Sequence, residues 1–137
     1  MKMEEHKRNF DVKIKGALDS MKNKRINQCP AFDKYEDIRI GWIYKFNVGG
    51  RIYYGKASNV NTRLRGHKSS LFNPNRDEYN KLLYKCIREN NYDYTIEIVI
   101  GVKYNTNRQL LAAEGGYINP IFRDKQLCLN KQLSFTY

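Results

Sequence analysis

The sequence from residue 40 to residue 55, IGWIYKFNVGGRIYYG, predicts a β-hairpin at the centre of the fold. Aromatic and β-branched residues fill both arms, and Gly49-Gly50 can supply the positive φ angles of a tight two-residue turn. With such a turn Phe46 faces Tyr53, and Tyr44 lies on the same face as both, whereas a loop of odd length would reverse this result. Two tyrosines on one face are either core residues or a pair of active-site hydroxyl groups.

The segments around the hairpin predict an α+β fold with a small, mostly antiparallel, three-stranded sheet flanked by helices. Apolar residues at helical spacing predict an amphipathic helix within residues 10–24, and a connecting loop follows at 27–34. The remaining elements are expected at about residues 59–69 (helix, with Asn59 as N-cap), 77–89 (helix), 94–100 (strand) and 106–117 (helix, opened by the capping box Thr106-x-x-Gln109).

Composition changes near residue 38 and divides the expected organisation in two. Residues 1–38 would form the N-terminal helix and its loop, and residues 39–137 would form the main domain. The helix could pack on the main domain, pair with a second copy or lie on DNA. Packing is the expected arrangement, because an apolar stripe usually faces its own core.

The 137 residues are enough for one domain that buries a core without disulfides or a structural metal. No stretch approaches the ~20 apolar residues of a membrane span, and the start, MKMEEHKRNF, lacks the apolar run of a secretory signal. We therefore expect a cytoplasmic protein, not a secreted one. Cys29, Cys86 and Cys128 are scattered and odd in number, which predicts free thiols without a zinc site.

The charge points to a polyanion as partner. The chain has 25 Lys and Arg against 14 Asp and Glu, a formal net charge of +11, and no acidic residue occurs between Ile38 and Arg76. Such a balance favours nucleic acid first and an acidic membrane second, although a basic face can also serve solubility alone. The cations expected to bind DNA are Lys45, Arg51, Arg65, Lys68 and Arg76.

Three polar residues stand out on the predicted helices. Arg63 and His67 are four residues apart and therefore share a face, which is either a binding surface or part of a site. Glu114 lies on the apolar stripe of its helix and is the only acid between residues 97 and 124. Because a buried carboxylate is costly unless it is paired, Glu114 is either in a structural salt bridge or a metal ligand.

Taken in order, several short motifs resemble the GIY-YIG nuclease family over residues 40–131. The motifs are Trp42-Ile43-Tyr44, Tyr53-Tyr54-Gly55, Arg63-x-x-x-His67, Glu114 and Asn130. Two positions depart from the family pattern: Trp42 stands in place of the first glycine, and Tyr54 in place of the isoleucine of the second triplet.

The resemblance implies a role for each matching residue. Glu114 would bind one divalent cation, Mg²⁺ or Mn²⁺, and Arg63 would contact the scissile phosphate. Tyr44 would position or deprotonate the attacking water, and Tyr53, Lys56 and His67 are candidates for assisting it. Asn130 would support the site through hydrogen bonds. The family chemistry implies products with a 5′ phosphate and a 3′ hydroxyl.

The sequence thus predicts a divalent-metal-dependent DNA endonuclease of the restriction, phage or mobile-element, or repair type. Its partner would be duplex DNA, and a homodimer would be the simplest way for a one-site domain to cut both strands. The rival interpretations are a catalytically silent nucleic-acid-binding module of the same fold and a nuclease that acts on RNA. The presence of Tyr44, Arg63 and Glu114 together argues against a silent module.

Overall fold

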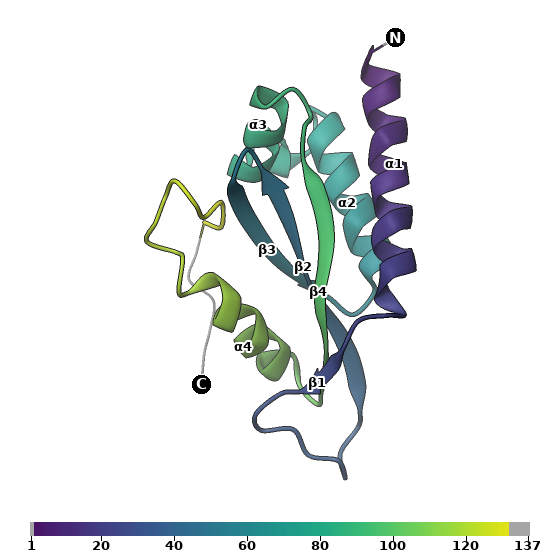
Figure 1. Cartoon of the computed structure of the whole chain (residues 1–137), viewed down its shortest axis with the longest axis vertical. Helices are drawn as coiled ribbons and strands as arrows, with labels where there is room; N and C mark the ends of the chain where they lie inside the picture. Colours follow the sequence, from purple (N-terminus) through teal and green to yellow (C-terminus); the bar gives the residue numbers. More distant parts are fainter. Residues whose placement is uncertain (1, 132–137) are drawn as a thin grey trace.

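The computed structural model describes residues 2–131, which form an α+β fold around a four-stranded mixed sheet (Figure 1). The elements are α1 (Lys2–Met21), β1 (Ile26–Gln28), β2 (Arg39–Val48), β3 (Arg51–Ala57), α2 (Val60–Phe72), the 3-10 helix η1 (Asp77–Asn80), α3 (Leu82–Glu89), β4 (Thr95–Tyr104) and α4 (Asn107–Ile118). Within this part of the chain, no helix has both the length and the apolar character that a membrane span requires.

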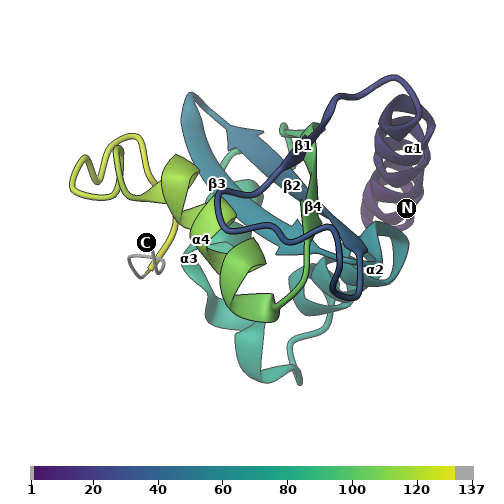
Figure 2. The same cartoon turned by 90° about the horizontal axis from the view of Figure 1, so that it is seen from below.

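The sheet lies between two layers of helices. Its strand order is β1-β4-β2-β3, with β2 antiparallel to both neighbours and β1 parallel to β4. Side chains of α1, α2 and α3 form the larger core on one face, and α4 packs on the other face, as the view from below shows (Figure 2). Each face of the sheet therefore has its own apolar cluster.

The predicted hairpin register is confirmed. Phe46 pairs with Tyr53 and Tyr44 pairs with Gly55, and Gly49 and Gly50 have φ angles of 56° and 82°. A Cβ atom on Gly55 would lie 2.3 Å from both Cζ and the hydroxyl oxygen of Tyr44. The Tyr44 ring thus lies directly across Gly55 and fills the space that the Cβ atom of any other residue at position 55 would need.

The helix caps read from the sequence are also present. The Asn59 side chain accepts a hydrogen bond from the Thr62 amide at 3.0 Å and opens α2. At the start of α4, Thr106 and Gln109 form the reciprocal capping box. Both signals are local in sequence, so they did not depend on the tertiary fold.

The prediction of a three-stranded sheet was wrong in the number of strands. Part of the loop predicted at 27–34 forms a fourth strand, β1. The pairs run from Ile26 with Gly101 to Gln28 with Lys103. All three residues of β1 are exposed, so the strand shows none of the alternating burial that pattern reading depends on. Gly101 permits the close approach, since a Cβ there would meet the Ile26 and Trp42 side chains at 2.9 Å.

The helix predicted at 77–89 is in fact two short helices. η1 ends at Asn80 and α3 begins at Leu82, and Lys81 between them has an extended ψ of 143°. No side chain caps either N-terminus. Leu83 and Ile87 are buried as the apolar spacing predicts, but Leu82 is exposed, and periodicity did not reveal the break.

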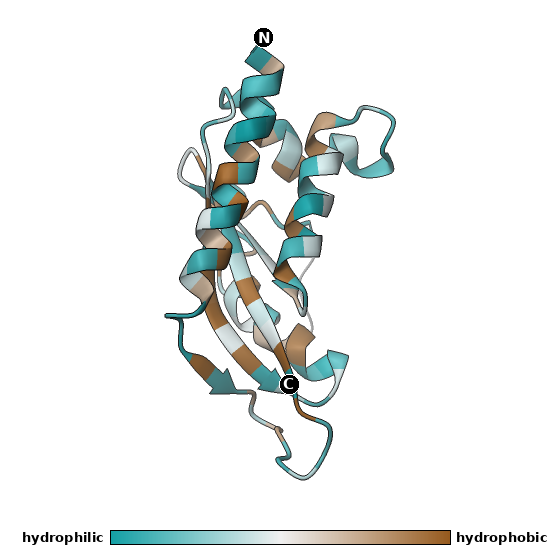
Figure 3. Ribbon diagram, turned by 90° about the vertical axis from the view of Figure 1, so that its right-hand side faces the viewer, coloured by the Kyte–Doolittle hydropathy of each residue, from teal (hydrophilic) through white to brown (hydrophobic). Residues whose placement is uncertain are grey.

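The N-terminal helix packs on the sheet. It spans Lys2–Met21 instead of residues 10–24, and its apolar stripe appears as brown bands in Figure 3. Phe10, Ile14 and Ala17 are buried in the same cluster as Tyr44. α1 therefore shares the main core with the strands that follow it.

The segment after α4 returns to the free edge of β3. Ile52 forms an isolated parallel bridge with Cys128, and its backbone bonds Leu127 and Leu129 at 2.7 and 2.8 Å. The side chain of Asn130 extends this pairing: its Oδ1 accepts from the Tyr54 amide at 3.0 Å, and its Nδ2 donates to the Tyr54 carbonyl at 2.9 Å. Residues 127–130 are thus held beside the hairpin.

Candidate active site

A cleft of about 430 Å³ opens where β3, α2, α4 and the chain end meet. Of the predicted site residues, those that line it are Tyr53, Lys56, Arg63, Glu114 and Asn130. These residues are separated by up to 77 positions (130 − 53) in the sequence, and the fold brings them to one place. Lys81 and Lys131 also line the cleft, so cations outnumber acids on its walls.

Helix α4 aims Glu114 into the cleft. Leu111, three residues before it, and Ile118, four residues after it, line the same wall, as helical spacing requires. Glu114 is half-buried and is the only carboxylate among the described lining residues. The apolar stripe that made Glu114 conspicuous in the sequence is therefore the wall of the cleft.

The donor set fits a hydrated Mg²⁺ ion. Mg²⁺ keeps several water ligands and often takes only one or two carboxylates from the protein, with substrate phosphate completing the shell. Residues 2–131 hold no group of three or more His, Cys, Asp or Glu side chains placed around a metal. An ion held by Glu114 would consequently take its other ligands from water and phosphate.

Tyr53 presents its hydroxyl to the cleft with an ammonium group beside it. Lys81 Nζ donates to the Tyr53 hydroxyl at 3.0 Å, and Tyr53 is 7% exposed. Lys81 was not predicted as a site residue, because residues 77–89 were expected to form one continuous helix. The break between η1 and α3 is what brings this side chain to Tyr53.

Tyr44 lies behind the cleft, not on its wall. Its side chain is fully buried, and its hydroxyl is 2.6 Å from Nε2 of His67. Nδ1 of His67 is in turn 2.7 Å from the hydroxyl of Tyr84. The three side chains form a continuous polar chain inside an otherwise apolar core, and Tyr84 is a member that the sequence did not single out.

Burial determines the charge of these groups. It raises the pKa of Tyr44 well above 10, an effect strengthened by Tyr53 and opposed by Arg63. Burial likewise raises the pKa of Tyr84. The pKa of His67 falls well below 6.5 through burial, with further lowering by Arg63 and Lys81. At neutral pH both tyrosines are therefore phenols and His67 is neutral.

Arg63 links the buried chain to the cleft. Its guanidinium is within hydrogen-bonding range of the Tyr44 hydroxyl, and it also lines the cleft. Burial disfavours its charge, but the oxygens of Tyr44 and Tyr53 outweigh this effect and raise the pKa of Arg63 above its usual value. Arg63 is thus a fixed cation with one side on a tyrosine and the other on the open cleft.

The cations predicted to bind DNA do not line this cleft. Lys45 lies 3.9 Å from Glu97, and Arg51 donates to the Lys125 carbonyl at 2.9 Å. Arg76 is exposed at the start of η1. Charge counting identified these residues, but it could not tell which surface each one would reach.

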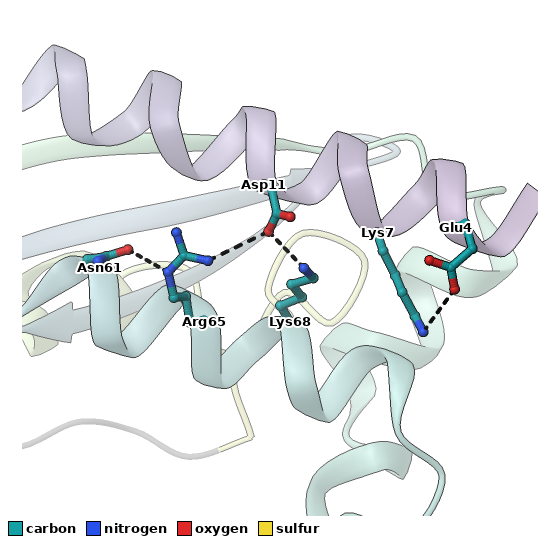
Figure 4. A network of polar contacts seen from close by, with 6 residues as sticks. All are labelled: Glu4, Lys7, Asp11, Asn61, Arg65 and Lys68. Atoms are coloured by element: carbon teal, nitrogen blue, oxygen red, sulfur yellow. Dashed lines mark hydrogen bonds and ion pairs between the residues drawn. The ribbon is translucent and has the colours of Figure 1, made fainter.

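The last two predicted DNA contacts, Arg65 and Lys68, lie on the opposite side of α2. Both approach Asp11 of α1, Arg65 at 3.8 Å and Lys68 at 2.8 Å, as Figure 4 shows. They border a separate depression of about 640 Å³ that Lys7 also lines. Helix geometry separates Arg65 from Arg63, because residues two apart on a helix point in different directions.

Comparison with known proteins adds no relative to this description. No family model, no curated protein and no solved structure matches the chain. The case for a function therefore stands on the residues of the cleft and on the order of motifs in the sequence.

Proposed function

We propose that the chain is a divalent-metal-dependent DNA endonuclease of the GIY-YIG type, with its active site in the cleft between β3, α2 and α4. The observation that carries the proposal is the convergence of Glu114, Arg63, Tyr53 and Lys56 on one cleft. A single carboxylate among several cations suits a phosphodiester better than a neutral substrate, because phosphate brings the negative charge that the walls lack.

Glu114 would hold the metal ion, Mg²⁺ or Mn²⁺. A divalent ion bound there would act as a Lewis acid on the scissile phosphate and stabilise the leaving 3′ oxygen. Glu114 is suited to this role because it is half-buried on α4 and lines the cleft.

Arg63 would bind a non-bridging oxygen of the same phosphate. Its guanidinium is held from behind by the Tyr44 hydroxyl, so its orientation is set before the substrate arrives. A preorganised cation of this kind stabilises the charge that grows in the transition state. Lys56 and Lys131, also on the cleft walls, would neutralise neighbouring phosphates of the strand.

The tyrosine that would orient the attacking water is Tyr53 in this arrangement. Its hydroxyl faces the cleft with Lys81 Nζ at 3.0 Å, whereas the Tyr44 hydroxyl is enclosed by His67 and Arg63. A nearby ammonium stabilises negative charge that develops on the oxygen atom. Tyr44 and His67 would then support the site from its interior side.

The direct test is to incubate supercoiled plasmid with the protein and Mg²⁺. We expect nicked and then linear DNA, complete inhibition by EDTA, and ends that carry a 5′ phosphate and a 3′ hydroxyl. Binding without nicking at any divalent ion would instead support the silent binding module. Faster cleavage of single-stranded RNA than of duplex DNA in the same assay would support the RNA nuclease.

A further inference from the structure

A chain of buried polar side chains runs from α3 to the back of the cleft. It begins at Tyr84, passes through His67 and ends at Tyr44, with distances of 2.7 and 2.6 Å between successive polar atoms. The relative exposures of the three residues are 1%, 0% and 0%. Ser70, which is also buried, is a hydrogen-bond partner of Tyr84 at the far end.

The direction of this chain is set at its cleft end. The Arg63 cation lies near the Tyr44 oxygen and has no lone pair to offer, so the hydroxyl turns its lone pairs toward Arg63 and its hydrogen away from it. The hydroxyl hydrogen of Tyr44 then needs an acceptor, and Nε2 of His67 is the one within reach. Since neutral histidine has one donor and one acceptor, Nδ1 must carry the hydrogen and donate it to Tyr84.

The opposite direction would leave a buried hydrogen without a partner. If Nε2 of His67 donated to Tyr44, the Tyr44 oxygen would accept from both His67 and Arg63. Its own hydrogen would then meet no acceptor among the contacts of residues 2–131 described for it. At the Tyr84 end either direction is satisfied, because the Ser70 hydroxyl can accept or donate.

We propose that Tyr84 is a positioning residue that accepts the Nδ1 hydrogen of His67 and so holds the imidazole and, through Tyr44, the Arg63 guanidinium in one orientation. With its hydrogen given to His67, Tyr44 turns its lone pairs toward Arg63. The effect on DNA cutting rests on the proposed function, but the tautomer itself does not. Tyr84 would thus act on the cleft from α3 without touching the substrate.

The tautomer is measurable by ¹⁵N NMR of the full chain at pH 7. His67 is one of only two histidines, and His6→Gln assigns its signals. We expect Nδ1 of His67 to be protonated in the wild type. In Tyr84→Phe the Nδ1 hydrogen loses its acceptor but Tyr44 still donates to Nε2, so the tautomer should stay and the ¹H and ¹⁵N signals of the Nδ1–H group should move upfield.

Tyr94→Phe is the matched control. Tyr94 is 3% exposed in the same core, but its hydroxyl is buried without a hydrogen-bond partner within the described residues. Removal of this hydroxyl should leave the Nδ1–H signals of His67 unchanged. The two variants therefore delete the same group from the same core and differ only in its connection to His67.

The nicking assay supplies the second readout. Tyr84→Phe should lower kcat roughly tenfold with KM within about twofold, as expected for a residue that orients another functional group. Tyr44→Phe should have a similar effect, and the double variant should be no slower than the slower single variant, because both act through Arg63.

Protonated Nε2 in wild-type His67, or Nδ1–H signals in Tyr84→Phe that match those of the wild type, overturns the inference. Equal cutting by Tyr84→Phe and wild type would remove the link from Tyr84 to Arg63 and overturn the positioning role. If the tautomer behaves as expected but the wild type does not cut DNA, the proposed function fails and the hydrogen-bond chain stands.

Discussion

The two faces of α2 differ in what holds their cations. On the cleft face, Arg63 lies against the buried hydroxyl of Tyr44, which is itself fixed by His67. On the outer face, Arg65 and Lys68 approach one carboxylate, that of Asp11, with side chains about half and one quarter exposed. One helix therefore carries a preorganised cation on one side and solvent-screened ion pairs on the other.

The difference shows that position, not charge, distinguishes a candidate site residue from a surface cation. Exposed ion pairs contribute little to stability, typically ~0–1 kcal/mol, and they exchange easily with solvent. A guanidinium held by a buried hydrogen-bond chain keeps one orientation and can stabilise a transition state without reorganisation. The contrast can be tested by paired substitutions on the two faces.

The largest expected difference between the two faces of α2 comes from its two arginines. Arg63→Ala should lower the single-turnover rate of plasmid nicking about 10²- to 10³-fold, as loss of a preorganised charge in an active site does. Arg65→Ala should change it less than about threefold, since its guanidinium lies toward α1. Equal losses in the two variants would mean that both faces contact DNA in a similar way.

Two glycines test how tightly the cleft side is packed. Gly55→Ala places a methyl group 2.3 Å from the Tyr44 ring and should reduce the free energy of unfolding by about 1–3 kcal/mol. Gly66→Ala, on α2, meets no atom within 4 Å and should raise it by roughly 0.5–1 kcal/mol through helix propensity. Urea denaturation of both variants measures the sign of each change in the free energy of unfolding. No change in Gly55→Ala would show that Tyr44 is free to move.

The third comparison uses pH. The pKa of His67 is lowered in the folded chain, so the unfolded chain binds the proton first as the pH falls. The contribution of neutral His67 to the free energy of unfolding is fully present above about pH 6.5. Below that pH the free energy of unfolding should fall by up to ~1.4 kcal/mol per pH unit. Urea denaturation between pH 7 and pH 5 should show a flatter dependence in His67→Gln.

Lys68→Ala, one residue along the same helix, is the control for that experiment. Its ammonium lies against Asp11 on the outer face, so the pH dependence should match the wild type. A slope that is equal in all three proteins would indicate that His67 is protonated as easily in the folded chain as in the unfolded one.

The sequence predicted those features that depend on local signals. Gly49-Gly50 and the alternating aromatics define the hairpin register, and the polar residues Asn59 and Thr106 mark two helix starts. Glu114 was identified because a carboxylate on an apolar stripe has few explanations, and the structure places it in a cleft. In each case the residue and its neighbours in sequence contain the physical reason.

The features that sequence analysis missed depend on tertiary contacts. β1 is held by backbone pairing with β4, and its exposed side chains leave no pattern. Lys81 reaches Tyr53 only because the chain breaks between two short helices. Tyr84 was not singled out, because the partner of its hydroxyl, His67, lies 17 residues away in sequence.

The most direct test of the proposed site is the rate of plasmid nicking in Mg²⁺ by Glu114→Gln beside the wild type. The substitution keeps the size of the side chain and removes its charge, so thermal unfolding should show an intact fold. We expect a loss on the order of 10³-fold or more, because the carboxylate is the metal ligand that the cleft provides. Nicking by Glu114→Gln at the wild-type rate would contradict the assignment of the cleft as a metal-dependent active site.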